Sequence, residues 1–333
     1  MQERILVTGA SGFIGRKLSF RLAQEGYHVI AFCRNSSQLI LHPNIEIIKG
    51  DILDLESLKA AMKDCKVVFH TAALAKMWSK NKRDFYDVNV VGTRNVCLAA
   101  IHHQVSKLIY TSSCGVLGPT LHSPMTENDP RIVGFPIEYE RTKYLAELEA
   151  DKFSDDLAIV TLRPSRVYGD GPITGSNTVS RMIDAYIRGK WKFVPGKGMS
   201  IANYVFVDDV VEGHVAAMKK IEQSEKFILG GDDVSFKQFF DTLTDISGVR
   251  HKLYEIPISL VEWYGRLQSV KTNIFGTEPQ ILPEFAERLK YNQKYSSQKA
   301  IDYLDYKITP FKEGMKTTVD FIINNQWKNI QQL

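Results

Sequence analysis

The strongest constraint on the fold is a glycine-rich segment near the start of the chain, Thr8-Gly9-Ala10-Ser11-Gly12-Phe13-Ile14-Gly15. It follows a short apolar run, residues 4–8, and precedes a helical pattern over 12–25 that ends at Gly26. An apolar run of this length is typical of a buried parallel strand. Glycines at a strand-to-helix turn allow a tight bend, a close approach of backbone to a phosphate, and packing of helix on strand.

The start of that helix offers free N–H groups and a positive dipole end to an anion. We therefore predict that this turn binds the pyrophosphate of a dinucleotide. The residues expected to contact it are Thr8, Gly9, Ser11, Gly12, Phe13, Ile14 and Gly15.

Strand and helix patterns alternate as far as about residue 163. Strands are expected at 27–33, 45–49, 66–70, 107–111 and 157–162, and helices at 55–62, 85–100 and 139–152. This alternation predicts an α/β fold with a doubly wound parallel sheet of the Rossmann type.

The pattern changes after Arg163. Residues 170–203 are rich in Gly, Pro, Ser and Asn, whereas 204–231 return to strand and helix patterns. Ser235 begins a helix with Gln238 in a capping box, and no alternating strands are expected beyond it. We predict a dinucleotide-binding domain over 1–169 with a return segment at 204–231. A smaller, mainly helical substrate-binding lobe is predicted over 170–203 and 232–333.

Composition excludes several other classes of protein. Hydrophobic residues make up 44% of the chain, and the formal net charge of +4 is small for 333 residues. Without a clustered basic face, we expect no nucleic-acid partner. The four cysteines match no zinc spacing, so no metal is expected. No apolar run is long enough to span a membrane, and no targeting segment is recognised, so a cytoplasmic protein is expected.

The end of the second expected strand indicates which nicotinamide cofactor is used. It carries Arg34 rather than the acidic residue that would bind a ribose 2′-hydroxyl. A guanidinium suits a 2′-phosphate, which favours NADP(H), with NAD as the alternative. Asp51 follows the third strand, where it can accept from the adenine amine, with Ile52 beside it. Small residues after the fourth strand leave room for the cofactor: Thr71, Ala72 and Ala73.

Tyr139 and Lys143 form a Tyr-x-x-x-Lys pattern on an expected helix. Spacing of four places both side chains on one helix face, where an ammonium lowers the pKa of a phenol. The tyrosine can then exchange a proton with a carbonyl or alcohol oxygen, and the lysine can also bind the nicotinamide ribose. Ser113 follows the fifth strand and can donate to the substrate oxygen. Ser112 is the alternative for that role and otherwise lines the nicotinamide pocket.

Three further polar positions are expected to have mainly structural roles. Asn89 lies on an apolar helix face, where a buried hydrogen bond is favoured over a proton relay. Asp208 or Asp209 is expected to cap the helix that begins near residue 208.

These motifs resemble those of extended short-chain dehydrogenases/reductases, the NAD-dependent epimerase/dehydratase family. The similarity covers the G-x-x-G-x-x-G spacing, Tyr-x-x-x-Lys, Asn89-Val90-Val91-Gly92-Thr93 and Arg163-Pro164-Ser165-Arg166-Val167-Tyr168-Gly169. It extends from Leu6 to about Val210. His70-Thr71-Ala72-Ala73 followed by Trp78 resembles the dihydroflavonol 4-reductase-like branch, which includes hopanoid-associated sugar epimerases.

The resemblance implies an NADP(H)-dependent oxidoreductase that reduces a ketone or aldehyde, or oxidises the alcohol. Tyr139 would be the proton donor, Ser113 would polarise the oxygen, and Lys143 would tune Tyr139. Pro164 and Val167 would bound the nicotinamide. The residues expected to face the substrate, unless they only pack the lobe, are Lys76, Trp78, Cys114, Tyr168 and Tyr204.

Two other functions remain open. A nucleotide-sugar epimerase or dehydratase would use the same residues with tightly bound NAD, and a non-catalytic sensor would only bind the dinucleotide. The resemblance also leaves open a homodimer formed through the helices near 85–102 and 139–152.

Overall fold

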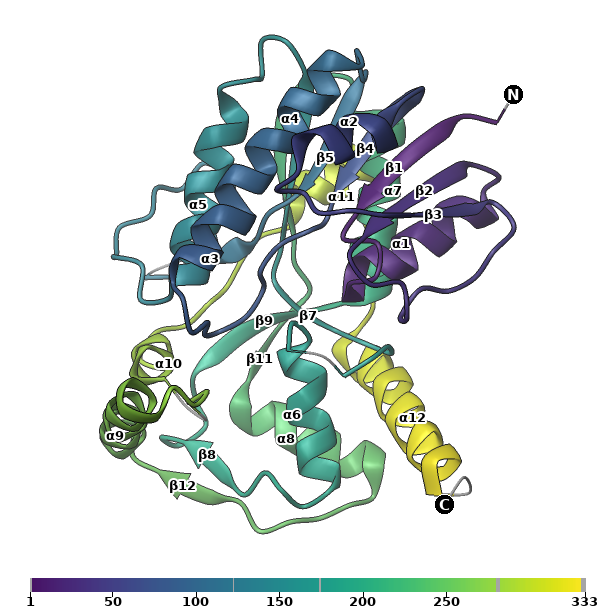
Figure 1. Ribbon diagram of the computed structural model, residues 1–333. Helices are drawn as coiled ribbons and strands as arrows, with labels where there is room; N and C mark the ends of the chain where they lie inside the picture. The colour runs from purple at the N-terminus through teal and green to yellow at the C-terminus, as the bar shows by residue number, and fades with distance from the viewer. Residues whose placement is uncertain (1, 122, 174, 280–281, 331–333) are drawn as a thin grey trace.

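The computed structural model describes residues 2–121, 123–173, 175–279 and 282–330. It has a larger lobe built on a seven-stranded sheet and a smaller lobe at one end of it (Figure 1). Within the predicted domain boundaries, residues 1, 122, 174, 280–281 and 331–333 lie outside the described residues.

Every strand pair of the large sheet is parallel. Apart from the edge strand β3 (Ile45–Lys49), its strands are largely buried by helices on both faces, which explains their apolar composition. In spatial order they are β10 (Glu225–Leu229), β6 (Ala158–Pro164), β5 (Lys107–Thr111), β4 (Cys65–His70), β1 (Arg4–Thr8), β2 (His28–Cys33) and β3 (Ile45–Lys49). The predicted doubly wound parallel sheet is confirmed.

Alternate side chains along each strand face opposite helix layers. Ile5 and Val7 join one core with α1 (Phe13–Gln24), α7 (Val207–Lys220) and α11 (Gln298–Leu304). Leu6 belongs to a second core on the other face (Figure 1). That core is completed by α2 (Leu55–Met62), α4 (Gly92–His102) and α5 (Glu138–Asp151).

The strand order reverses between β1 and β4, since the chain proceeds from β1 to β2 on one side and from β4 to β5 on the other. A crevice forms outside the carboxyl ends of the strands at such a switch point. The glycine turn follows β1, Thr71 follows β4, and the serine pair follows β5. The fold therefore brings these segments to one edge of the sheet.

The smaller lobe contains more strand than the sequence pattern predicts. It has a three-stranded sheet of β11 (Asp232–Ser235), β9 (Ile201–Phe206) and β7 (Arg166–Tyr168), and a pair formed by β12 (Tyr254–Ile256) and β8 (Phe193–Pro195). A strand of three residues is too short to show an alternating pattern, so the expectation of helix and loop sequence after Ser235 missed β12.

Three helices of the smaller lobe pack on one aromatic-rich core: α6 (Thr178–Ile187), α8 (Phe236–Ser247) and α12 (Phe311–Ile330). Two others, α9 (Ile258–Phe275) and α10 (Pro283–Arg288), pack against each other. Ser235 and Gln238 form the predicted capping box at the start of α8.

Two local predictions need correction. The helix expected over 85–100 is a run of α3 (Arg83–Tyr86), a π-helical turn η1 (Asp87–Val91) and α4. Neither aspartate caps α7, whose first turn has no side-chain cap. Instead Asp208 accepts a hydrogen bond from Lys17 at 2.6 Å, and Asp209 accepts from the backbone and hydroxyl of Thr309.

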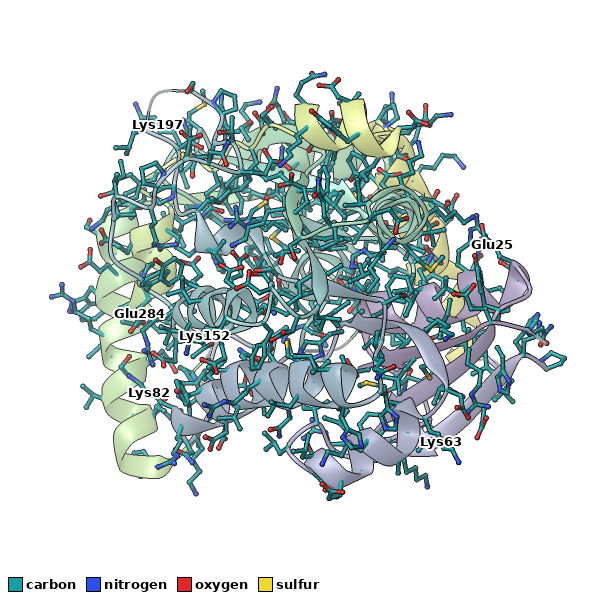
Figure 2. All side chains as sticks on the ribbon, turned by 90° about the horizontal axis from the view of Figure 1, so that it is seen from above. Glu25, Lys63, Lys82, Lys152, Lys197 and Glu284 are labelled. Carbon is teal, nitrogen blue, oxygen red and sulfur yellow. The ribbon has the colours of Figure 1, made fainter. Side chains whose placement is uncertain are left out.

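Charged side chains such as Glu25, Lys63 and Lys152 extend from the periphery of the molecule (Figure 2). Among the described residues, no helix is long and apolar enough to cross a membrane. The same part of the chain contains no cluster of His, Cys, Asp and Glu able to hold a metal ion.

Candidate active site

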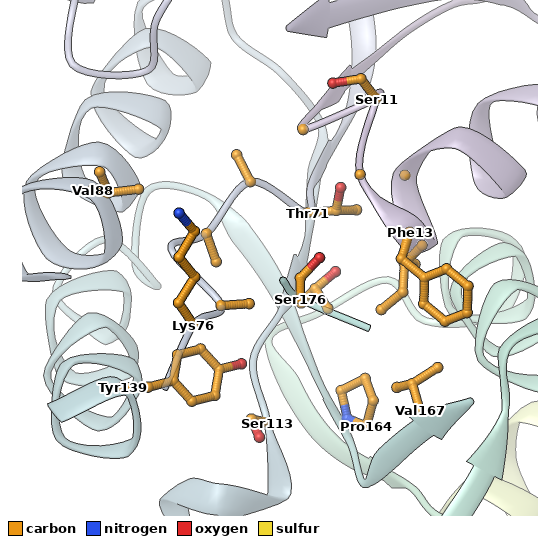
Figure 3. Close-up of a pocket in the computed structure, with 18 of the residues that line it drawn as sticks. Ser11, Phe13, Thr71, Lys76, Val88, Ser113, Tyr139, Pro164, Val167 and Ser176 are labelled. Carbon is orange, nitrogen blue, oxygen red and sulfur yellow. The ribbon is translucent and has the colours of Figure 1, made fainter. Parts of the chain in front are cut away.

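A pocket of about 450 Å³ lies at the carboxyl edge of the large sheet (Figure 3). Tyr139 and Lys76 lie on one side of it, and Phe13 and Val167 lie on the other. Most residues predicted to bind a cofactor line this pocket: Gly9, Ser11, Gly12, Phe13, Ile14, Gly15, Arg34, Asp51, Ile52, Thr71, Ala72, Ala73, Ser112, Tyr139, Pro164 and Val167.

The glycine turn has the geometry of a phosphate cradle. Gly9 has φ +67°, and a Cβ there would lie 2.6 Å from the backbone nitrogen of Ala72. A Cβ at Gly15 would lie 2.3 Å from the carbonyl oxygen of Gly9, so helix α1 can pack this closely only without a side chain. No side chain caps the first turn of α1, which leaves its N–H groups to an anion. These residues fit a bound pyrophosphate.

Thr8 does not line the pocket. Its hydroxyl is hydrogen bonded to Nδ1 of the buried His70 at 2.8 Å, and Nε2 of His70 lies 3.0 Å from the hydroxyl of Thr93. Burial lowers the pKa of His70 to about 3, so the ring is neutral. Thr8 therefore has a structural role behind the cradle, contrary to the cofactor contact predicted for it.

Arg34 and Asp51 lie at the far end of the pocket from Tyr139, after β2 and β3. Their side chains approach to 4.0 Å, and Arg34 is 72% exposed. Asp51 also accepts a hydrogen bond from the backbone N–H of Leu53 at 3.0 Å. The next residue along from Arg34 in the pocket wall is Asn35, so the end of β2 offers a cation and an amide but no carboxylate.

Tyr139 stands in the first turn of α5 and its hydroxyl points into the pocket, with Ser113 nearby (Figure 3). Burial raises the pKa of Tyr139 to about 12, although a hydrogen bond with Ser113 and the charge of Arg288 act to lower it. Ser113 follows β5, and its hydroxyl accepts from the backbone N–H of Gly115 at 3.1 Å. The structure thus brings the predicted phenol and serine together.

The position of Lys143 differs from the prediction that its ammonium group lowers the pKa of Tyr139. Its Nζ donates to the carbonyl oxygen of Thr111 at 2.8 Å and lies 4.3 Å from the ring centre of Tyr110. Burial lowers the pKa of Lys143 to about 7. Lys143 does not line the pocket, and the pKa of Tyr139 is raised rather than lowered. In this arrangement Ser113 and Arg288, not Lys143, are the groups that favour the phenolate.

Ser112 is held by a buried ion pair beneath the pocket. Its hydroxyl donates to Glu147 Oε1 at 2.5 Å, and Arg163 donates to both oxygens of Glu147 at 3.0 and 2.7 Å. Burial alone would raise the pKa of Glu147, but the hydrogen bonds and charge of Arg163 outweigh it and lower that pKa. The Ser112 hydroxyl is therefore committed, which leaves Ser113 as the serine available to a substrate.

Asn89 has the structural role that was favoured for it. Its Oδ1 accepts from the backbone N–H of Leu74 at 2.7 Å, and its Nδ2 donates to the hydroxyl of Thr142 at 3.0 Å. These two bonds fix the loop after β4 and helix α5 against η1. Both ends of the amide are used, so no relay role is needed to explain this buried residue.

Of the five residues predicted to face a substrate, only Lys76 lines the pocket. Cys114 is buried and its thiol donates to the carbonyl oxygen of Arg163. Tyr168 and Tyr204 are fully buried in the aromatic core of the smaller lobe. Trp78 is half-buried outside the pocket wall. Cys114, Tyr168 and Tyr204 therefore pack in the core, which was the alternative role left open for them.

Several pocket residues were missed by the sequence analysis. They include Val88, Ser165, Arg166, Ser176, Thr178, Val179 and Arg288. Arg288 comes from the end of α10, far along the chain from every motif. No local pattern could have found it, since its position depends on how the smaller lobe folds over the sheet.

Comparison with known proteins agrees with this architecture. Residues 5–230 match the model of the NAD dependent epimerase/dehydratase family. The human short-chain dehydrogenase/reductase family 42E member 1 is 30% identical, covering 93% of this chain and 85% of the relative. A Synechocystis sp. protein named provisionally as a dihydroflavonol 4-reductase is 26% identical, covering 99% of this chain and 98% of that protein.

Sterol-4-alpha-carboxylate 3-dehydrogenase, decarboxylating, from Mus musculus is 28% identical over 95% of this chain and 90% of its own length. The crystal structure of gox2253 has a TM-score of 0.83 and 29% identity, covering 97% of this chain and 99% of that chain. The predicted resemblance is confirmed: this chain belongs to the NAD dependent epimerase/dehydratase family, among the extended short-chain dehydrogenases/reductases.

Proposed function

We propose that this protein is an NADP(H)-dependent oxidoreductase that reduces a ketone or aldehyde, or oxidises the corresponding alcohol. The observation that carries the proposal is the position of Tyr139. Its hydroxyl points into a pocket whose other end is the uncapped, glycine-lined start of α1 (Figure 3). A proton-exchanging group and a dinucleotide cradle thus share one cavity.

A bound nicotinamide cofactor would supply or accept the hydride. With its pKa raised to about 12, Tyr139 keeps its proton at neutral pH and can donate it to a carbonyl oxygen. Ser113 would donate a second hydrogen bond to that oxygen and support its developing negative charge. In the oxidative direction, the charge of Arg288 and the hydrogen bond from Ser113 would favour the phenolate that removes the alcohol proton.

The names of relatives agree with this chemistry. One relative is named as a 3-dehydrogenase and another as a reductase, and both align over almost the whole chain. For the cofactor, Arg34 supports NADP(H), because a guanidinium after β2 suits a 2′-phosphate and no carboxylate follows that strand.

A substrate screen tests the proposal. Purified protein is offered a panel of ketones, aldehydes and alcohols with NADPH, NADH, NADP⁺ and NAD⁺, while nicotinamide absorbance is followed. We expect turnover with at least one carbonyl compound and a higher kcat/KM with NADPH than with NADH. Turnover with NADH alone would contradict the cofactor assignment.

The same preparation separates the two other functions. Stoichiometric NAD retained through purification, with no affinity for NADPH, would identify an epimerase or dehydratase that recycles its cofactor. Tight NADPH binding without turnover of any carbonyl compound, alcohol or nucleotide sugar would identify a sensor.

A further inference from the structure

Two arginines near Tyr139 share the carboxylate of Glu140, and a third arginine nearby has no carboxylate partner in the described part of the chain. Arg131 Nη2 donates to Glu140 Oε2 at 2.9 Å, and Arg288 Nε lies 3.3 Å from Glu140 Oε1. The side chains of Arg131 and Glu140 are 6% and 5% exposed, and that of Arg288 is 19% exposed. Arg166, the third arginine, pairs with no carboxylate among the described residues.

One neutral oxygen links the two arginines that border the cofactor pocket. Gln293 Oε1 accepts from Arg166 Nη2 at 3.0 Å and from Arg288 Nη2 at 3.2 Å. Nε of Arg288 is buried and donates no hydrogen bond. Two guanidinium groups that converge on one amide oxygen repel each other, and burial makes such an excess of charge costly unless an anion compensates it.

Nearby acidic side chains do not supply that anion. Glu287 pairs with Lys290 at 2.8 Å, and Glu138 pairs with Arg141. Counting Arg131, Arg166 and Arg288 against Glu140 leaves two positive charges without a counter-ion in the described part of the wall. These charges lie beside Tyr139 and therefore at the end of the pocket opposite Arg34.

A second cavity of about 300 Å³ begins at the same arginine. Arg288 lines both cavities. The second one has an apolar and aromatic part, formed by Pro119, Val133, Phe135, Pro136, Tyr291 and Tyr295, and a polar part, formed by Arg131, Glu140, Glu287, Arg288 and Gln293. A ligand that reaches from Tyr139 into this cavity would place its polar group at Arg288 and its body against these side chains.

We propose that Arg288 and Arg166 bind an oxyanion of the substrate, and that an apolar substrate body occupies the second cavity. A carboxylate fits best, since a guanidinium fork pairs with it in two hydrogen bonds, whereas a sugar would leave its hydroxyls unpaired against the apolar wall. The inference rests on the proposed function for the reacting position at Tyr139. It adds the substrate class, an apolar oxo acid or hydroxy acid.

Binding of matched probes to the protein saturated with NADP⁺ tests the inference without turnover. The probes are 2-naphthoate and its neutral counterpart 2-naphthamide, with benzoate and benzamide as a smaller pair, each followed by calorimetry. We expect the carboxylate of at least one pair to bind about tenfold more tightly, and the difference to shrink as salt is added. Equal or weaker binding of both carboxylates, including no binding at all, would overturn the inference.

Substitution of Arg288 assigns the preference to this site. Arg288→Gln should remove the carboxylate preference while NADPH affinity stays within about twofold, and Arg288→Lys should keep part of it. Arg250→Gln is the matched control, because Arg250 is exposed and lines neither cavity. A preference that survives Arg288→Gln would place the anion elsewhere. If Arg288→Gln unfolds, Arg166→Gln is expected to weaken the same preference.

Two further outcomes are distinguishable. If uridine diphosphate binds more tightly than 2-naphthoate, the site prefers a nucleotide to an apolar acid. That result would contradict the inference. Failure of the proposed function would appear instead as no change in nicotinamide absorbance in the substrate screen, whatever the probes show.

Discussion

The hydroxyl of Ser112 already has a buried partner, whereas that of Ser113 lies beside Tyr139. Both serines line the pocket. From the sequence alone, either hydroxyl could donate a hydrogen bond to the substrate oxygen. The carboxylate that decides between them, Glu147, comes from the far end of α5. These adjacent residues thus differ in role because the Ser112 hydroxyl is hydrogen bonded to a buried carboxylate.

Substitution of each serine separates these roles. We predict that Ser113→Ala lowers kcat/KM by about 10²-fold, the usual effect of losing one donor to a developing oxyanion. Ser112→Ala should change kcat/KM less than about fivefold and should lower thermal stability instead, since it leaves a buried carboxylate with one donor fewer. Steady-state kinetics and melting curves measure both effects, and the reverse pattern would show that Ser112 polarises the substrate.

Arg34 provides the test of cofactor preference. We predict that Arg34→Ala raises the dissociation constant of NADPH about 10-fold or more and leaves that of NADH within twofold, because only NADPH has a 2′-phosphate. Arg83→Ala is the control, since Arg83 is equally exposed and lies outside the pocket wall. Fluorescence titration measures the constants. Equal weakening of both cofactors would refute the 2′-phosphate assignment.

The sequence identified single residues well where a motif fixes their surroundings. The glycine turn and Tyr139 were found because their neighbours in sequence are also their neighbours in space. Lys143 was placed on the right helix face, but its partner is a carbonyl oxygen on β5, which helical spacing does not reveal. The sequence left open whether Tyr204 packs or binds, because an aromatic residue looks the same in sequence in both roles; the structure places it in the core of the smaller lobe.

Helix α5 and strand β6 are joined beneath the pocket by the ion pair of Glu147 and Arg163. Both side chains are nearly inaccessible, 4% and 7% exposed. Removing one member of such a pair leaves the other charge buried and alone, which costs far more than the pair contributes. The pair therefore fixes the element that carries Tyr139 against the strand that follows it in the chain.

Glu147→Gln should lower the free energy of unfolding by about 3–5 kcal/mol, measured by urea denaturation at neutral pH. The control, Asp151→Asn, removes an exposed partner of Lys226 on the same helix and should cost less than about 1 kcal/mol. Losses of equal size would show that burial of the pair has no special role.

The same pair predicts how stability depends on pH. The pKa of Glu147 is lower in the folded protein than its ordinary value of 4.5. Its contribution is therefore complete above that ordinary value and is lost as pH falls through the lowered pKa. The difference in stability between the native protein and Glu147→Gln should shrink on acidification over this window, and a constant difference would contradict the linkage.

Six of the seven strands of the large sheet were predicted with bounds, and so were the helices between them. Their apolar patterns are strong, because each packs against a neighbouring layer. The long helices α9 and α12 of the smaller lobe were not predicted individually. The π-helical turn at Asp87–Val91 leaves no such signal, since its extra residue shifts the helix face without breaking the pattern. The short strands of the smaller lobe are held by tertiary pairing alone.

The surface of the whole molecule retains apolar side chains on two adjacent helical segments. Leu98 on α4 and Leu148 on α5 are 38% and 45% exposed, and Tyr86 and Tyr144 are exposed near them in the chain. Helices α4 and α5 pack against each other, so these residues belong to one face of the larger lobe. We propose that this face forms a homodimer, which would cover side chains that are costly to leave in water.

Size-exclusion chromatography with light scattering tests whether the protein forms this homodimer. The native protein should have twice the monomer mass, and the double variant Leu98→Glu/Leu148→Glu should have the monomer mass. Leu41→Glu is the control, since Leu41 is 80% exposed on a loop away from these helices. A monomeric native protein would rule out this dimer.

Two lobes that close over one sheet edge explain why the site was only partly predictable. The larger lobe supplies the cradle and Tyr139, all within recognisable motifs. Arg288 lies in the same pocket, but it belongs to the smaller lobe and to a segment that has no such motif.

Replacement of the Tyr139 hydroxyl tests the central claim most directly. Tyr139→Phe keeps the ring and removes only the group that exchanges the proton. We predict that kcat/KM for carbonyl reduction falls at least about 10²-fold to 10³-fold, while the dissociation constant of NADPH stays within twofold of the native value. Turnover by Tyr139→Phe at the native rate would contradict the account.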